Sequence, residues 1–252
     1  MSTAVVSGWN TEASPRLQAR IAGFLYLMVI VTGIYAILLV RSALFVTGDP
    51  AATAANIIAH EMRFRLGFAA EIITCVCSIP IEVIFFNLFR VVNRSVTLLL
   101  VFFGLVSTAI EAVVLLNHFA PIVLLGDPRY LSAFKPEQLQ AQAYMSLVLQ
   151  DIGLGIALVF FGVYCLVLGY LIFRSTFLPR IIGVLLAVEG LGYLVNSFLL
   201  FLAPALAAKF FPYFMPMAIA EISLSLWLII VGVNVGRWEE QVERSRGRSA
   251  AA

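Results

Sequence analysis

The segment that decides the fold reads GFAAEIITCVCSIPIEVIFFNLF over residues 67–89. An α-helix needs about 20 apolar residues to cross the hydrocarbon of a bilayer, and this segment is long enough although it contains Glu71 and Glu82. A charged group at the centre of a membrane helix costs about 2.5–3.5 kcal/mol on insertion scales. The two carboxylates therefore have to face other helices or an internal cavity rather than lipid.

Apolar segments of similar length recur at residues 21–40, 96–116, 147–173, 181–202 and 214–235. The first exceeds the apolar core of roughly 7–15 residues in a cleaved signal peptide, so we interpret it as a retained helix. The segment at 96–116 stays apolar past Pro121, where its helix either kinks or continues. The pattern predicts an all-α fold, a polytopic membrane protein with a bundle of six transmembrane helices. The later segments carry four more acids, Glu111, Asp151, Glu189 and Glu221.

The bulk composition supports the same class. Charged residues make up 12% of the chain, against about 25% in soluble domains, and the mean hydropathy is +1.02. A net charge of +2 without a basic stripe predicts no nucleic-acid partner, and the lipid bilayer is the expected partner. The three cysteines predict no disulfide framework. Motifs of soluble enzymes are absent from the sequence, which leaves any cofactor unknown.

Lys and Arg in the loops predict the orientation. Six spans place both termini on one side, and that side holds ten of these residues against six on the other. We therefore expect a cytoplasmic segment at 1–20, a membrane domain at 21–236 and a basic cytoplasmic tail at 237–252. Arg244, Arg246 and Arg248 in that tail would meet anionic lipid heads.

The first outer loop contains the helix-start signal Gly48-Asp49-Pro50, in which Asp49 would cap a helix that begins at Pro50. The residues that follow predict a short amphipathic helix on the outer interface or over the bundle, because apolar side chains recur at helical spacing. These are Ala51, Ala55, Ile58 and Met62. The same signal returns at Gly126-Asp127-Pro128.

Helical spacing also groups each acid with small or polar residues on one face. The longest such stripes are Glu71, Cys75, Ser78 and Glu82, and Gly104, Ser107, Glu111 and His118. Counting from the segment ends places most of the acids in the outer half, so converging stripes would form an outward-facing acidic chamber with Arg63, Arg65 and His60 at its rim. The strongest ligand-binding candidates are Glu71, Glu111, Asp151, Glu189 and Glu221, followed by His118 and Arg65.

Packing is the alternative interpretation of these residues. Polar side chains hydrogen-bond across membrane helices for about 0.6 kcal/mol on average. Arg63 or Arg65 would then pair with Glu71, and His118 would be a satisfied structural residue. Six acids spread over five segments nevertheless exceed what packing requires.

Several segments resemble a bacterial membrane family called domain of unknown function 4386. They are RIAGFLYL at 20–27, GDPAATAANI at 48–57, FRLG at 64–67, GY at 169–170, Ser175 with FLPRIIG at 177–183, and Glu221 with Trp227-Leu228. The resemblance covers most of the chain, and its Asp-x-x-x-Thr-x-x-Asn segment is fairly specific. It implies six spans in a bacterial cytoplasmic membrane and directs attention to Asp49, Thr53, Asn56, Arg65 and Glu221, but it implies no activity.

Three hypotheses about function remain. In the first, the acidic chamber binds or transports a proton, a cation or a small cationic solute. In the second, the chain is an intramembrane lipid-modifying hydrolase whose metal is held by His118, Glu111, Asp151 and Glu221. Two histidines are few for a zinc site, and a site of carboxylates alone would suit Mg²⁺ or Mn²⁺ better. In the third, it is a structural or regulatory subunit whose acids serve packing against a membrane-protein partner or a second copy.

Overall fold

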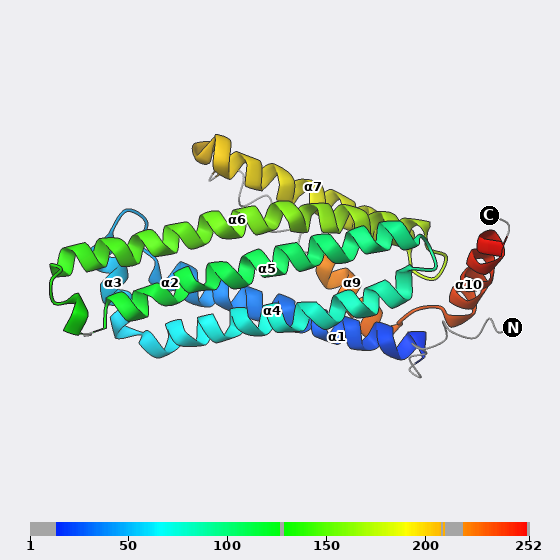
Figure 1. The fold of residues 1–252 in the computed structure, drawn as a ribbon, viewed down its shortest axis with the longest axis horizontal. Coiled ribbons are helices and arrows are strands. Elements are labelled where there is room, and N and C mark those ends of the chain that lie inside the picture. Colours follow the sequence, from blue (N-terminus) through cyan, green and yellow to red (C-terminus); the bar gives the residue numbers. More distant parts are fainter. Residues whose placement is uncertain (1–13, 127–128, 208, 210–218, 251–252) are drawn as a thin grey trace, which may run out of the picture.

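The computed structural model describes residues 14–126, 129–207, 209 and 219–250, and helices make up nearly all of this part (Figure 1). The main helices are α1 (Pro15–Ile34), α3 (Pro50–Ala59), α4 (Glu61–Phe89), α5 (Arg94–Leu124), α6 (Pro136–Arg174), α7 (Arg180–Leu202), α9 (Ile219–Ile230) and α10 (Val235–Ala250). Shorter elements are the π-helix η1 (Tyr35–Arg41), α2 (Ser42–Leu44) and the 3₁₀ helix η2 (Arg129–Leu131).

Within the described residues, five helices are long and apolar enough to cross a membrane. They are α1 with its continuation to Leu44, and α4, α5, α6 and α7. A sixth follows if α9 and α10, which meet at 101°, count as one bent span. The all-α polytopic membrane fold is thus confirmed. The predicted sixth segment begins outside the described residues, and α9 ends at Ile230, before a turn in which Gly232 takes the left-handed φ of +73°.

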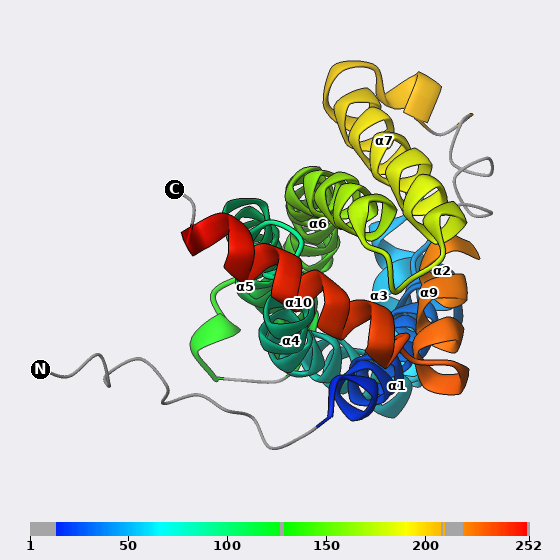
Figure 2. The same ribbon diagram turned by 90° about the vertical axis from the view of Figure 1, so that its right-hand side faces the viewer.

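The long helices form a closed ring (Figures 1 and 2). Helix α1 packs on α4, α4 on α5, α5 on α6, α6 on α7, α7 on α9, and α9 on α1 again. Each helix therefore has one face toward its neighbours and one toward lipid. Large apolar side chains are exposed on the outer faces, among them Phe24, Phe102, Leu116 and Ile181. The ring gives the polar stripes an interior that they can face.

Two helices extend beyond the predicted segments. Helix α5 continues through Pro121 to Leu124 without ending there. Helix α6 begins at Pro136, eleven residues before the predicted segment, and has 39 residues, which makes it about 58 Å long. The polar start of α6 carries no hydropathy signal, but Lys135 N donates to Gln138 Oε1 at 2.9 Å, which helps to begin the helix.

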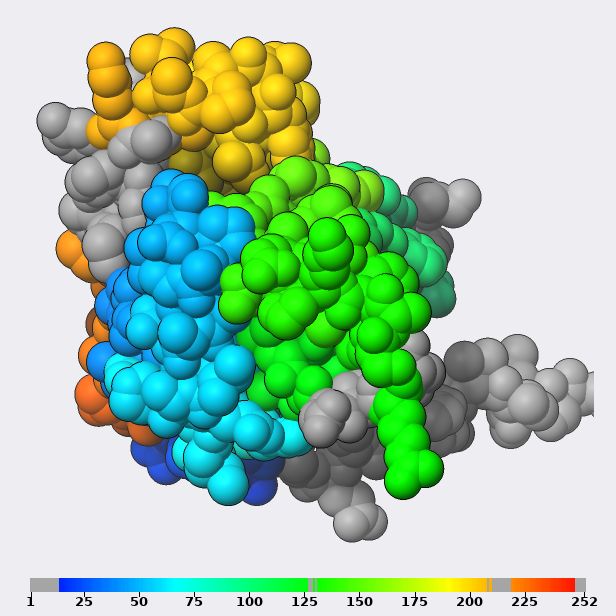
Figure 3. Space-filling view, turned by 90° about the vertical axis from the view of Figure 1, so that its left-hand side faces the viewer, coloured from blue at the N-terminus to red at the C-terminus, as the bar shows by residue number. Residues whose placement is uncertain are grey.

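The predicted helix of the first outer loop is α3, and its Asp49 cap is present: Ala52 N donates to Asp49 Oδ1 at 2.8 Å. Helix α3 lies beside the beginning of α6 (Figure 3), and we call this the α3 end of the bundle. The buried face of α3 differs from the predicted apolar row. Thr53, Ala54 and Ile57 are buried, whereas Ile58 is exposed and Met62 belongs to α4.

The chain after residue 236 forms the amphipathic helix α10, which crosses the opposite end of the bundle (Figure 2); we call this the α10 end. Trp238 Nε1 donates to the Leu88 carbonyl at 3.1 Å, and Thr176 N donates to Gln241 Oε1 at 3.1 Å. A hydropathy average misses such a helix, because its apolar residues are few and only their spacing reveals it.

Candidate functional site

Three helices bring together Cys165 of α6, Glu189 of α7 and Glu221 of α9, which we call the deep carboxylate cluster. One ligand atom from each residue lies within 4.8 Å of those of the other two. Tyr26 of α1 completes the group, because its hydroxyl donates to Glu221 Oε1 at 3.0 Å. Four helices of the ring thus contribute to one small polar region.

The deep carboxylate cluster lies well inside the bundle. Cys165 is nine residues before Arg174, Glu189 is nine after Arg180, and Glu221 is nine before Ile230, all counted from helix ends at the α10 end. Nine residues correspond to about 14 Å of helix, close to the midplane of a hydrocarbon layer of about 30 Å. Cys165 and Glu189 are buried at this depth, and Glu221 is partly buried.

Glu189 is the unusual member of this cluster. Glu189 is 1% exposed, and neither carboxyl oxygen forms a well-aligned hydrogen bond within the described residues. The Tyr193 hydroxyl group, one turn further along α7, is close enough to interact with this carboxyl group. An unpaired buried polar group costs about 1–3 kcal/mol, and a charged one more. Two neighbouring carboxylates also repel each other strongly in a medium of low dielectric constant. A proton or another cation between Glu189 and Glu221 removes both penalties.

Glu71 of α4, His118 of α5 and Gln150 of α6 form a second group, the outer triad. His118 Nδ1 is 2.6 Å from Glu71 Oε2, and Gln150 Nε2 is 3.1 Å from Glu71 Oε1 and 3.2 Å from His118 Nδ1. His118 Nε2 faces the Phe64 carbonyl at 3.3 Å, an acceptor only, so Nε2 carries a proton. The Nδ1–Oε2 distance is that of an ion pair when His118 is protonated.

The histidine of the outer triad is buried among aromatic side chains. The rings of Phe64 and Phe68 lie 4.5 and 5.8 Å from the His118 ring, and His118 is 3% exposed. These contacts agree with the interpretation of His118 as a satisfied structural residue. Glu71 accepts a hydrogen bond from Gln150, whereas neither carboxyl oxygen of Glu189 accepts a well-aligned one within the described residues.

Asp151 pairs with Arg41 at the end of the π-helix η1. Arg41 Nη2 is 2.5 Å from Asp151 Oδ2 and 2.9 Å from the Leu147 carbonyl, and its guanidinium lies 4.0 Å from the centre of the Phe45 ring. The Asp151 side chain is 47% exposed. This ion pair joins the first span to α6 and lies apart from the deep carboxylate cluster.

The remaining candidates lie elsewhere. Arg65 donates to Glu61 Oε1 at 2.7 Å, so the predicted pairing of Arg65 with Glu71 is wrong; the one-turn spacing of Glu61 and Arg65 favours their contact. Glu111 is partly buried and close enough to interact electrostatically with Glu71. The predicted metal set of His118, Glu111, Asp151 and Glu221 does not form a metal-binding group in the described structure.

Several other stripe residues serve packing. Ser107 Oγ donates to the Ala157 carbonyl and Ser225 Oγ to the Gly23 carbonyl, both at 2.9 Å, and such bonds join neighbouring helices. Glu82 packs directly against Gly104, where a Cβ would overlap its carboxyl group. The glycine in that stripe thus makes room for an acid on the next helix.

The polar residues of the first outer loop also have local partners. Thr53 Oγ1 donates to the Asp49 carbonyl at 2.8 Å, and Asn56 Nδ2 donates to the Leu44 carbonyl at 3.2 Å. Thr53 Oγ1 in addition accepts from Val46 N at 3.0 Å. Asp49, Thr53 and Asn56 therefore shape the loop and begin α3.

The sequence did not single out Tyr26, Arg41, Gln150 or Cys165 as site residues. Cys165 is one of three cysteines in apolar segments, and Arg41 is one of the basic residues that follow the first apolar segment. Gln150 is adjacent to Asp151, which is the one signal that it offered. Which helices are neighbours in the ring decides all four contacts, and helical spacing within one segment carries no information about that.

Comparisons with known proteins agree with the fold. The sequence model of the family described as "Domain of unknown function (DUF4386)" matches residues 21–232. An uncharacterized protein of Archaeoglobus fulgidus is 28% identical over 79 residues, which are 31% of this chain and 46% of that relative, so the match spans about half of the relative. No solved structure matches the chain. Since the family match extends over most of the sequence, the chain belongs to the DUF4386 family.

Proposed function

We propose that the chain binds a cation, either a proton or a metal ion, in the deep carboxylate cluster and passes it across the membrane. The observation that carries this proposal is Glu189, whose two buried carboxyl oxygens form no well-aligned hydrogen bond among the described residues, although the Tyr193 hydroxyl group is close and Glu221 and Cys165 lie within 4.8 Å. A buried acid kept without a partner at a cost in stability is typical of function rather than of packing.

The ligand atoms define which cations fit. Two carboxyl groups alone can share a proton. With the Cys165 thiolate they offer sulfur and oxygen to one ion, a mixed set that suits a borderline divalent metal such as Zn²⁺ better than Mg²⁺ or Ca²⁺. The Tyr26 hydroxyl, which donates to Glu221, holds that carboxyl group in place.

Further acids provide a route from the α3 end, which the loop charges predict to be outside. Along α5, His118, Glu111 and Gly104 follow at intervals of seven residues, or about 10 Å. His118 contacts Glu71, and Gly104 packs against Glu82. An acidic side chain therefore lies at or beside each of these three positions along α5. A spacing of about 10 Å is longer than a hydrogen bond, so the proposal requires water molecules between successive acids.

Binding is tested by thermal unfolding of the detergent-purified protein at several pH values and with added Na⁺, Mg²⁺, Mn²⁺ or Zn²⁺. A bound cation stabilises the folded protein by mass action and so raises its unfolding temperature. At a cation concentration of 100 times the Kd, the free energy of unfolding increases by about 2.7 kcal/mol. We expect a cation-dependent shift in the parent and in Glu137→Gln, an exposed acid outside the site, and none in Glu189→Gln or Glu221→Gln. Equal shifts in all four proteins would contradict the proposal.

A further inference from the structure

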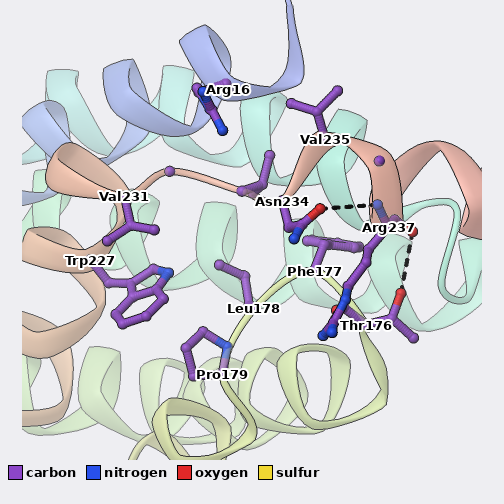
Figure 4. A pocket seen from close by; sticks show the side chains of 13 residues that line it. Arg16, Thr176, Phe177, Leu178, Pro179, Trp227, Val231, Asn234, Val235 and Arg237 are labelled. Atoms are coloured by element: carbon purple, nitrogen blue, oxygen red, sulfur yellow. Dashed lines mark hydrogen bonds between the residues drawn. The ribbon is translucent and has the colours of Figure 1, made fainter.

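A cavity of about 420 Å³ lies at the α10 end, and its lining contains none of the acids of the candidate functional site (Figure 4). Its walls come from four parts of the chain: the beginning of α1, the α6–α7 connection, the end of α9 and the turn into α10. Apolar side chains form much of the lining, including Phe177, Leu178, Trp227 and Val231. An adjoining cavity of about 480 Å³ shares Thr176, Leu178, Pro179 and Arg237 with it and adds Arg180.

The charged groups of this cavity are mainly basic. Arg16 and Arg237 lie on two sides of it (Figure 4). Within the described residues, neither these two nor Arg180 forms an ion pair with an acid, and Glu240 at the adjoining cavity pairs with Arg244 at 3.6 Å. Arg237 Nη1 donates weakly to the Thr176 carbonyl at 3.4 Å, which leaves most of its five N–H donors for a ligand.

The backbone adds positive charge at the same place. Helix α10 begins at Val235, and Asn234 Oδ1 accepts from Arg237 N at 3.1 Å. The N–H groups of Val235 and Gly236 have no intrahelical acceptor, because the first turn of a helix lacks preceding carbonyls. They carry the partial positive charge of the helix N-terminus, which favours anions. Gly232 lets the turn pass close to Arg16, since a Cβ there would be 3.1 Å from Arg16 Cγ.

We propose that this cavity binds a phosphate group, supplied by the headgroup of an anionic phospholipid. Two arginines and a helix N-terminus recognise the phosphate, and the apolar part of the lining would contact the first carbons of the acyl chains. The cavity lies at the beginnings of α1 and α7 and at the end of α9, which is where headgroups meet a membrane protein. Free phosphate shares this chemistry and would compete for the same donors.

The test is a titration of the detergent-purified full chain, with the unfolding temperature as the readout. The probes are short-chain phosphatidylglycerol, short-chain phosphatidylcholine and inorganic phosphate. The site variant is Arg16→Gln with Arg237→Gln. The matched control is Arg63→Gln with Arg129→Gln, which removes two exposed arginines at the other end of the bundle.

We expect phosphatidylglycerol to raise the unfolding temperature saturably in the parent and in the control, and phosphatidylcholine to do so far less. The site variant should bind phosphatidylglycerol about 30-fold more weakly, since each basic residue near an anionic headgroup contributes about a factor of five. Arg16→Lys with Arg237→Lys keeps the charges and should retain most of the affinity.

The three probes distinguish the source of the phosphate. Stabilisation by phosphatidylglycerol alone supports a lipid site, and competition by inorganic phosphate supports recognition of the phosphate group itself. The proposal is overturned if phosphatidylcholine stabilises the protein equally, if no probe stabilises it, or if the control loses as much affinity as the site variant.

Discussion

Glu189→Met is expected to stabilise the fold while abolishing its response to cations. Methionine has nearly the length of glutamate and no group that needs a hydrogen bond, so it removes two unpartnered buried oxygens and keeps the volume. The expected gain is about 1–3 kcal/mol in the free energy of unfolding, measured by thermal or denaturant unfolding in detergent without added cations. A gain of stability with a loss of function is typical of a strained site.

Glu71→Met is the matched control for this substitution. Glu71 has partners in His118 and Gln150, so the same change should destabilise the protein, because each of them loses one polar contact in a buried site. If the two acids served packing alike, both variants would lose stability. Destabilisation by Glu189→Met equal to that by Glu71→Met would show that Glu189 is a structural residue.

Gly190→Leu is expected to separate α7 from α6. The two antiparallel helices touch through two glycine pairs, Gly162 with Gly190 and Gly169 with Gly183. A Cβ on Gly190 would lie 2.5 Å from the Gly162 carbonyl oxygen, and a backbone atom has no rotamer that lets it give way. The overlap should cost about 3 kcal/mol and move Glu189, the preceding residue, away from Cys165.

Gly33→Leu is the control that separates steric overlap between helices from the general effect of replacing glycine by leucine in a helix. Nothing lies within 4 Å of a Cβ at Gly33 in α1, so this variant makes the same chemical change without overlap. Leucine is the better helix former by up to about 1 kcal/mol, and we expect Gly33→Leu to unfold at or above the parent temperature. Similar unfolding temperatures for Gly33→Leu and Gly190→Leu would refute the close packing of α6 and α7.

Hydropathy and capping signals in the sequence predict much of the fold. The segment at 67–89 lies within α4, and Asp49 caps α3 as its position before Pro50 predicts. Hydropathy misses α10, because this helix has few apolar residues and only their spacing reveals it. It also misses the start of α6, because the polar residues after Lys135 precede the apolar segment. The residues 214–218 of the predicted sixth segment lie outside the described structure.

The candidate site was predictable only in part, because sequence patterns specify helix faces but not neighbours. Glu71 and Glu189 look alike in the sequence, each an acid on a stripe of small and polar residues. The packing of α4 on α5 gives Glu71 its histidine, whereas the packing of α6, α7 and α9 places Glu189 beside a thiol and a second acid. Only this arrangement distinguishes the satisfied acid from the unsatisfied one.

Cation flux into vesicles tests the central claim most directly. The full chain is reconstituted into liposomes that contain a pH-sensitive dye or, in a parallel set, a dye for divalent metals, and a proton or Zn²⁺ gradient is imposed. The account predicts that the parent and Glu137→Gln dissipate one of these gradients faster than protein-free vesicles, and that Glu189→Gln behaves like protein-free vesicles. Flux through Glu189→Gln at the parent rate, or no flux through the parent with either cation, would contradict it.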